Sequence, residues 1–380
     1  MATGNPVTSA ISPYAGDMHD DAQVEVAGQL KLIWWRFRRH RLAIVSLALV
    51  LAIYLLIVPF VEFWAPFDPE EPNSVFPFAP PQTLYLFDGG RFAPHVHSYT
   101  SRVDPATYKR VFEGDPEQKV FLNFFVHAEP YKLLGLIDTN IHFFGPDDPE
   151  HRIFFLGADR LGRDMFSRLI YGTRISMSIG LVGVALSLVF GIILGGLSGY
   201  YGGVVDNVIQ RAIEFLSSMP RVPLWLGLSA AIPLTWDPLH VYFMITIILS
   251  LLGWPQLARV VRGRFLSIKS DDYVISAWLD GADRWRIILR HMLPSMYSHI
   301  IASVTLAIPG MILAETALSF LGLGLRPPII SWGVLLKEAQ NVRTVAQAPW
   351  LLIPALAVIV SVLALNFLGD GLRDAADPYK

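Results

Sequence analysis

Histidine is the residue type in this chain whose spacing first suggests chemistry, because five histidines lie between residues 95 and 151. Metal sites need ligands grouped at short helical or finger-type spacings. Two of the five are close together in a proline-flanked segment, but no partner pair with such spacing follows. The chain has no cysteine and no GxxxxGK[ST], GxSxG or HExxH motif, so neither a metal site, a cofactor nor catalytic activity is expected. The histidines are His95, His97, His127, His142 and His151.

A second candidate is Glu315, a carboxyl group at the end of an apolar run. An ionisable residue at membrane depth commonly belongs to a substrate path, and the alternative is a structural pair with an arginine of residues 160–174. The following FLGLGLRPP is interrupted by glycine and proline, as expected of backbone that lines a cavity near the outer mouth of a path. The candidate path or gate residues are Glu315, Ser319, Phe320, Gly322 and Gly324.

Charged residues of alternating sign precede the apolar run that begins at residue 175. Two interpretations stay open for them: a lattice of ion pairs at the membrane surface, or a contact surface for a protein docked outside the membrane. The candidate residues of this extracytoplasmic interface are Asp159, Arg160, Gly162, Arg163, Asp164 and Arg168.

The elements that must position these residues are membrane helices. Hydrophobic residues make up 53% and charged residues 16% of the 380 residues, against about 45–50% and 25% in soluble domains. The apolar residues form runs long enough to cross a bilayer, which predicts an all-α membrane protein with six transmembrane helices. A net charge of −2 without a basic patch excludes a nucleic-acid partner. The predicted spans are 42–61, 175–205, 208–236, 238–258, 292–314 and 344–369.

Two of these spans have distinctive compositions. The 208–236 run contains three charged residues and three prolines, so an amphipathic entry helix is an alternative to a span. The segment GIILGGLSGYYGG, residues 191–203, has glycines at spacings that allow close helix packing. We therefore expect these glycines chiefly at a helix–helix contact.

Lysine and arginine are denser before the first span and in the loop after the fourth than in the short loop after the fifth. The positive-inside rule places these clusters, and both termini, in the cytoplasm. The predicted segments are a cytoplasmic N-terminal segment (1–41), a first transmembrane helix (42–64), an enlarged extracytoplasmic insert (65–174) and a five-helix core (175–380) with a cytoplasmic loop at 263–294.

That loop contains ISAWLDGADRWRIILRHMLP, residues 275–294, which is charged but periodic. Its apolar residues recur at helical spacing on both sides of Gly281, which predicts two short amphipathic helices joined by a glycine turn. Ser270, Asp271 or Asp272 can cap the first helix and Asp283 the second. The pattern alone fits either a helix lying on lipid headgroups or a docking element for a partner protein.

The motif GADRWRIILRHMLP resembles the cytoplasmic coupling loop of bacterial ABC-importer permeases, with Ile275 and Ser276 in place of the usual Glu and first Ala. FFLGADRLGRDMFSRLIYGTRISMSIG, AETALSFLGLGLRPP, SWG and GDGLRDAADP resemble the C-type membrane subunit of the peptide/nickel branch. The resemblance covers about residues 30–75 and 150–380 and leaves the insert between them unexplained. The ATPase-coupling residues that it implies are Tyr273, Ile275, Ser276, Ala277, Gly281, Ala282, Trp285, Leu293 and Pro294.

This resemblance implies a multi-pass permease of the bacterial inner membrane, embedded in the lipid bilayer. It implies a second homologous permease subunit, two ATPase subunits and an extracytoplasmic substrate-binding protein as partners. Oligopeptides or dipeptides are the expected substrates, with opine or sugar conjugates and nickel as alternatives. A secondary transporter would need buried charges in several spans, and an intramembrane enzyme a nucleophile or metal constellation. The sequence has few charges within its predicted spans and no visible nucleophile or metal constellation.

Overall fold

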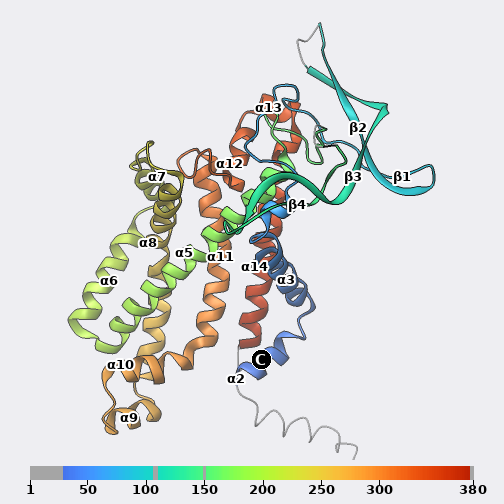
Figure 1. Cartoon of the computed structure of the whole chain (residues 1–380). Coiled ribbons are helices and arrows are strands. Elements are labelled where there is room, and N and C mark those ends of the chain that lie inside the picture. Colours follow the sequence, from blue (N-terminus) through green and yellow to red (C-terminus); the bar gives the residue numbers. More distant parts are fainter. Residues whose placement is uncertain (1–28, 106–109, 149–150, 377–380) are drawn as a thin grey trace, which may run out of the picture.

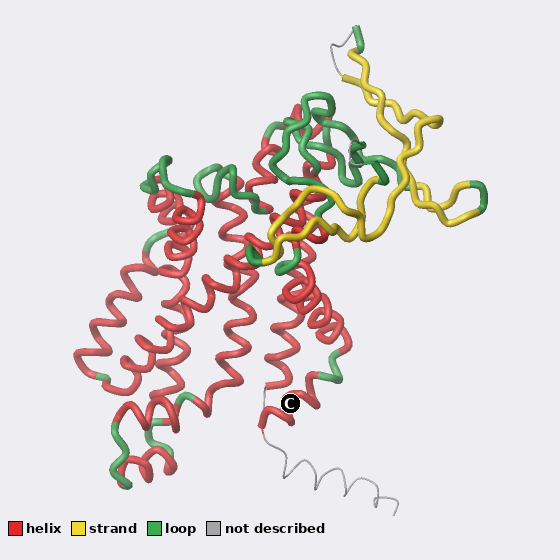
Figure 2. Tube along the Cα trace, in the orientation of Figure 1, coloured by secondary structure: helices red, strands yellow, loops and turns green. Residues whose placement is uncertain are grey.

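Long apolar helices make up most of the chain, and a β-sheet projects from one end of them (Figures 1 and 2). The computed structural model describes residues 29–105, 110–148 and 151–376. The helices before the sheet are α2 (Gln29–Phe37), α3 (Arg41–Ala52), the π-helix η1 (Ile53–Ile57) and α4 (Val61–Trp64). Those after it are α5 (Met165–Tyr201), α6 (Gly203–Ser218), α7 (Arg221–Ala230), α8 (Pro238–Ile268), α9 (Asp272–Leu279), α10 (Arg284–Arg286), η2 (Ile287–Met292), η3 (Pro294–Met296), α11 (Tyr297–Phe320), α12 (Trp332–Leu336), η4 (Lys337–Gln340), α13 (Val342–Gln347), η5 (Pro349–Leu352) and α14 (Ile353–Ala376).

Four helical stretches in the described part of the chain are long and apolar enough to cross a membrane. A fifth, Arg41–Ile57, is apolar but shorter. The predicted 208–236 span is not one helix, because the chain breaks at Pro220 into α6 and α7. Figure 1 shows α6 and α7 leading in succession from the far end of α5 back toward the sheet end. The four long stretches are Met165–Tyr201, Pro238–Ile268, His299–Phe320 and Pro349–Ala375.

Helix α5 begins before the predicted span 175–205 and ends within it. The Asp164 side chain accepts a hydrogen bond from the Ser167 backbone N–H at 2.7 Å and so caps the helix at Met165. The helix ends at Gly202, whose φ of +65° is a conformation that glycine adopts readily. Cap and stop residues therefore set bounds that the apolar run alone did not reveal.

Helices α5 and α8 pack closely along one glycine face of α5. A Cβ atom at Gly195 would lie 2.5 Å from the Ala258 carbonyl oxygen, and one at Gly191 would lie 2.8 Å from the Leu257 side chain. Glycine thus lets the two backbones approach where any side chain would separate them. The expected packing role is confirmed for Gly191 and Gly195, whereas Gly202 and Gly203 lie where α5 ends and α6 begins, with nothing within 4 Å of an added Cβ atom.

Replacing Gly195 with alanine is expected to destabilise the chain, although alanine is the better helix former. The added methyl group collides with backbone of α8, which cannot move aside as a flexible side chain would. The matched control is Gly263→Ala in α8, where nothing lies within 4 Å and a gain of up to about 1 kcal/mol is expected. Thermal unfolding of the detergent-purified variants measures both, and equal midpoints would contradict the close-packing account.

The sheet is antiparallel, in the order β1-β2-β3-β4, and lies inside the predicted insert. Its inner side chains Val96, Val120 and Leu122 pack with Phe67 and Ile153 from the segments on either side of it. The sheet is a correction to the expected all-α fold. Residues 85–146 lack a helical period, and their register shifts interrupt the alternation that would have predicted strands. The strands are β1 (Tyr85–Asp88), β2 (Arg91–Val103), β3 (Arg110–Leu133) and β4 (Ile137–Pro146).

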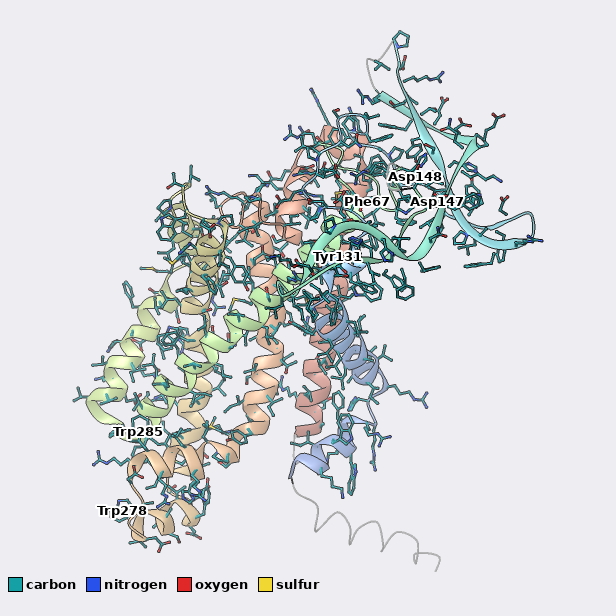
Figure 3. The ribbon with its side chains drawn as sticks, viewed as in Figure 1. Phe67, Tyr131, Asp147, Asp148, Trp278 and Trp285 are labelled. Carbon is teal, nitrogen blue, oxygen red and sulfur yellow. The ribbon has the colours of Figure 1, made fainter. Side chains whose placement is uncertain are left out.

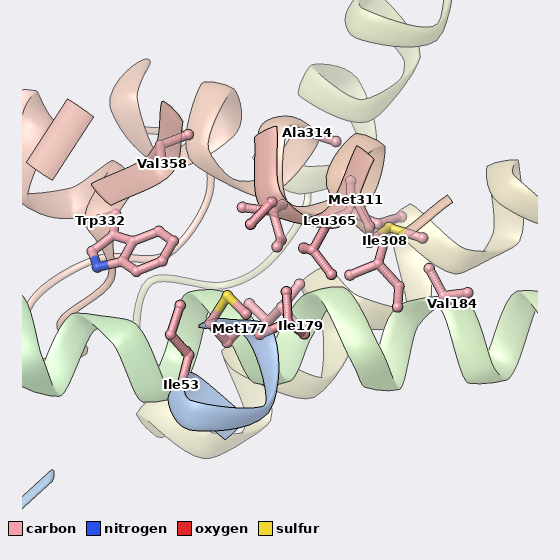
Figure 4. Packing of buried hydrophobic residues seen from close by; sticks show 14 of the residues in the cluster. Ile53, Met177, Ile179, Val184, Ile308, Met311, Ala314, Trp332, Val358 and Leu365 are labelled. Carbon is pink, nitrogen blue, oxygen red and sulfur yellow. The ribbon is translucent and has the colours of Figure 1, made fainter. Parts of the chain in front are cut away.

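The largest hydrophobic core lies where α3, η1, α5, α11 and α14 meet (Figure 4). Met177 of α5, Ile312 of α11 and Leu365 of α14 are buried there together with Ile53 of η1. At the end opposite the sheet, the last described turn of α14 lies near α2, and α9 and α10 lie at that same end (Figure 1). Residues 1–28 of the predicted N-terminal segment lie outside the described residues.

Candidate functional site

The charged segment after α8 folds into α9 and the continuous helical piece α10–η2, joined by a turn. Gly281 in that turn has a φ of +79°, as a glycine-specific turn requires. The Asp283 side chain accepts from the Arg286 backbone N–H at 3.2 Å, so the predicted cap of the second helix is confirmed. Asp271 occupies the N-cap position of α9, but its side chain makes no capping hydrogen bond.

One face of this segment attaches it to the membrane helices. Val274 and Ala277 of α9 and Met292 of η2 are buried in a cluster that includes Val261 and Phe265 of α8. The apolar periodicity therefore serves packing within the chain. The segment does not need a lipid surface to cover this face.

Other large apolar side chains of this segment are left exposed by the described part of the chain. Trp278 is 64% exposed and Trp285 is 55% exposed, and Leu279 and Leu289 beside them are also exposed. Figure 3 shows both tryptophans at the end of the molecule farthest from Tyr131 of the sheet. An exposed apolar patch that contains tryptophan is typical of a surface that binds a protein or a membrane. We call the exposed residues Trp278, Leu279, Trp285 and Leu289 the docking face.

Some of the predicted coupling residues are buried and others are exposed. Ala277 is buried on the inner face, and Ala282, Leu293 and Pro294 are half-buried at the base of the segment. Trp285 is the one predicted coupling residue in the docking face. Trp278 was not predicted as a coupling residue, although its spacing placed it on an apolar stripe of the helix. The exposed predicted residues are Tyr273, Ile275, Ser276, Gly281 and Trp285.

Polar contacts join this end of α8 to the turn between α5 and α6. The Arg262 guanidinium binds the Asp206 carboxylate, with Nε 2.6 Å from Oδ1. Lys269 donates from Nζ to the Tyr200 carbonyl oxygen at 2.6 Å. A displacement of α9 and η2 would therefore act on α5 as well as on α8.

Glu315 lies fully buried in α11 and accepts hydrogen bonds from three serines. Its Oε1 atom accepts from Ser319 and Ser331, each at 2.7 Å, and Oε2 accepts from Ser176 of α5 at 3.4 Å. These partners rule out one of the two alternatives for Glu315, a pair with an arginine of residues 160–174, because none of the described arginines forms an ion pair with this carboxyl group.

Each of the three serines also accepts from a backbone N–H of the segment after α11. Ser319 accepts from Leu325 at 2.9 Å, Ser331 from Val334 at 3.2 Å, and Ser176 from Trp332 at 3.1 Å. We call this arrangement the Glu315–serine network. It fixes residues 325–334 against α5 and α11, and the path role of Glu315 stays a prediction.

The remaining predicted path residues surround the same network. Ser319 belongs to it, and a Cβ atom at Gly324 would lie 2.6 Å from the Ser319 backbone nitrogen. Gly322 has a φ of +78°, and Phe320 is half-buried. The structure thus brings these residues together in a packed turn of backbone, and the turn geometry explains both glycines.

The predicted extracytoplasmic interface contains a connected set of ion pairs. Asp159 contacts Arg163 at 2.7 Å and Arg168 at 3.5 Å, and Arg163 reaches Glu338 of η4 at 3.5 Å. Burial, together with the nearby Asp159 charge, raises the pKa of Glu338. The ion-pair lattice, one of the two interpretations of this segment, is therefore present.

The other residues of that segment have separate roles. Asp164 caps α5, and burial raises its pKa to about 6. Gly162 is buried with a φ of +75°, and a Cβ atom there would lie 2.0 Å from the Asn73 carbonyl oxygen. Arg160 alone of the six is exposed.

A cavity of about 380 Å³ opens between α5, α7, α8 and α11. Arg221, Trp225 and Gln256 line it, together with Ser187 and Ser303. Polar side chains at membrane depth usually face a protein interior or a water-filled path. This cavity was not predicted from the sequence, although an arginine and a glutamine within or beside apolar runs indicated a polar site there. Within the described residues, no group of three or more histidine or acidic side chains could hold a metal ion.

The fold and these sites define a multi-helix membrane protein with an uncovered docking face. Residues 187–379 match the family described as binding-protein-dependent transport system inner membrane component, and the chain belongs to that family. Residues 28–81 match the N-terminal TM domain of oligopeptide transport permease C.

Three relatives illustrate the similarity. The dipeptide transport system permease protein DppC of Bacillus subtilis is 38% identical over 235 residues, which are 61% of this chain and 70% of that protein. The oligopeptide transport system permease protein OppC of Haemophilus influenzae is 40% identical over 59% of this chain and 70% of that protein. The glutathione transport system permease protein GsiD of Pectobacterium atrosepticum is 40% identical over 59% and 72%, respectively.

Proposed function

We propose that this chain is the membrane-spanning permease subunit of an ATP-driven importer of oligopeptides or dipeptides. The docking face carries the proposal, because two exposed tryptophan side chains on short helices at one end of the molecule fit a surface that a partner protein covers. The names of the relatives support the substrate class, since they are dipeptide, oligopeptide and glutathione permeases. Motifs for ATP binding are absent from the sequence, so hydrolysis belongs to partner chains.

The proposed partners are two ATPase subunits, a second homologous permease and an extracytoplasmic substrate-binding protein. The ATPase takes the docking face, which includes the coupling residue Trp285, and the exposed coupling residues Tyr273, Ile275, Ser276 and Gly281 are near that contact in the sequence. Because Arg262 and Lys269 tie this end of α8 to the α5–α6 turn, ATP-driven movement reaches α5. A ligand or partner shifts two states only through contacts that differ between them. The docking contact must therefore differ between the open and closed ATPase pair.

We propose six membrane crossings in the bacterial inner membrane, with α6 and α7 together making the third. This arrangement is consistent with the shared position of α2, α9 and the end of α14 opposite the sheet (Figure 1). It puts both termini and the docking face in the cytoplasm and the 65–174 insert outside. The ion-pair lattice at Asp159 then lies on the outer side, where Arg160 remains available to a binding protein.

The cavity lined by Arg221, Trp225 and Gln256 is the proposed contribution of this subunit to the peptide path. Arg221 can pair with a peptide carboxylate, and Gln256 and Trp225 can hydrogen-bond to peptide groups. The Glu315–serine network, with Phe320, Gly322 and Gly324, instead holds the outer turn beside the path.

Purification of the tagged chain from gently solubilised membranes tests the proposal. We expect a second permease and P-loop ATPases to co-purify, with ATPase activity that peptide and binding protein stimulate. A chain that purifies alone, and transports peptide in vesicles without ATP, would instead establish secondary transport.

Gly281 provides a sharper test of the lever. Replacing it with valine, a β-branched residue, is expected to abolish peptide-stimulated ATPase activity, since a φ of +79° is strained for such a side chain. Gly281→Asn is the matched control, because asparagine tolerates the left-handed region and no atom lies within 4 Å of the new Cβ. Full stimulation in the valine variant would refute a coupling role for this turn.

A further inference from the structure

Five aromatic side chains meet where the sheet lies against the end of the first membrane helix. The Trp64 ring lies 4.7 Å from the Phe143 ring, and Phe143 in turn lies 5.7 Å from Phe124 and 5.8 Å from Phe125. Phe63 contacts Phe125 and Phe143 at 6.3 Å and 5.8 Å. We call Phe63, Trp64, Phe124, Phe125 and Phe143 the aromatic cluster. Its members come from α4, β3 and β4, so the contacts join the sheet to the membrane helices.

The cluster is at the level of the last turn of the apolar helix Arg41–Ile57. The Trp64 indole donates from Nε1 to the Leu56 carbonyl oxygen at 2.7 Å. Leu55 and Leu56 themselves are exposed large hydrophobic side chains, as expected of a helix that faces lipid. The aromatic surface is therefore continuous with a lipid-facing surface.

The chain leaves the outer part of the cluster uncovered. Phe124 is 55% exposed and Phe125 is 61% exposed. Phe125 has a φ of +56°, an unusual value for an aromatic residue, and sits beside another exposed phenylalanine. An observed backbone outlier of this kind commonly marks a functional constraint.

Neighbouring side chains of the β3–β4 hairpin make contacts within the protein. His142 of β4 lies with Nδ1 2.7 Å from the Ala65 carbonyl oxygen, and Phe144 packs on Phe155 and Phe166 at 5.4 Å and 5.5 Å. These contacts fix the hairpin against the membrane helices. In Figures 1 and 2, β3 and β4 lie at the sheet end of the bundle, where they contact α4 and where Phe144 reaches Phe166 of α5. The hairpin thus contacts the membrane helices through one set of side chains and exposes phenylalanine side chains elsewhere.

We propose that the aromatic cluster sits in the lipid headgroup layer on the sheet side of the bilayer and anchors the insert there. Aromatic side chains concentrate at this depth in membrane proteins, where their rings leave water without entering the hydrocarbon fully. The sheet lies between the two family matches, residues 28–81 and 187–379, so the family assigns it no role. The proposal needs only the membrane location of the family, and it holds whatever the transporter carries.

The absence of cysteine from the sequence allows a direct test. A single cysteine at Phe124 or at Phe125 is labelled with an environment-sensitive fluorophore in the full chain, which is reconstituted in nanodiscs containing nitroxide-labelled lipids. Leu55→Cys, on the exposed side of the membrane helix, is the lipid-facing control. Glu113→Cys, at an exposed position farther along β3, is the matched control on the same sheet.

We expect lipids with a nitroxide on the headgroup to quench most of the fluorescence at Phe124 or Phe125. Nitroxides deep in the acyl chain are expected to quench the Leu55 label instead, and neither lipid the Glu113 label. Phe124→Cys guards against a local distortion at the strained Phe125. Quenching no greater than at Glu113 at both phenylalanine positions would overturn the proposal. So would protection of these labels by a co-purifying protein rather than by lipid.

Discussion

The variant Glu315→Ala is expected to unfold at a markedly lower temperature than the unaltered chain, with a loss of about 3 kcal/mol or more of folding free energy. The substitution leaves three buried serine hydroxyls without their acceptor, and each such loss typically costs about 1–3 kcal/mol. It also opens a cavity between α5 and α11. Thermal unfolding and size-exclusion profiles in detergent measure the effect.

Glu315→Gln is the matched control for this prediction. Glutamine keeps an oxygen that can accept from both Ser319 and Ser331, so it should retain most of the stability. Ser331→Ala should fall between the two, because it removes one donor and leaves the Val334 N–H without its acceptor. An alanine variant that is as stable as the unaltered chain but defective in transport would contradict the structural role and support a role of Glu315 in the substrate path.

The variant Trp278→Ala is expected to lose ATPase subunits on purification while keeping its own fold. Buried tryptophans at the centre of an interface typically contribute about 2 kcal/mol or more, which corresponds to roughly 30-fold in affinity. Because the side chain is 64% exposed in the chain alone, its removal costs the isolated chain little. Co-purification yield and thermal unfolding of the isolated chain measure the two effects separately. This prediction rests on the proposed function.

Trp236→Ala is the matched control for Trp278. Trp236 is also an exposed tryptophan, but it lies in the segment between α7 and α8, at the other end of α8. Its removal should leave ATPase association unchanged. If both variants lose the ATPase equally, or if neither does, the docking face is not where the ATPase binds.

Features that depend on neighbouring residues could be predicted from the sequence. The Gly281 turn and the Asp283 cap involve residues within a few positions of each other, and both are present as expected. The glycine face of α5 also follows from spacing along one helix, and its close contact with α8 is confirmed. Such features depend on residues close together in the sequence and are therefore visible in it.

Features that depend on distant segments could not be predicted. Ser176 lies 139 residues before Glu315, and nothing near either residue in the sequence identifies the other as a partner. An arginine was the partner considered in one of the two alternatives because charge is visible in a sequence, whereas a hydroxyl brought in by helix packing is not. The sheet was missed for the related reason that its pairing follows register shifts, which break the alternation of a simple strand.

Helix α5 has a further consequence for the motion of the molecule. It has 37 residues, so its length is roughly 55 Å at about 1.5 Å per residue. Its first turn is capped by Asp164, and its far end adjoins the contacts of Lys269 and Asp206. If the helix moves as a rigid body, a rotation about one end displaces the other end. A rigid tilt of about 5° about one end would displace the other by roughly 5 Å, about one helical turn. A small rotation of α5 would therefore be enough to reshape the cavity that this helix lines.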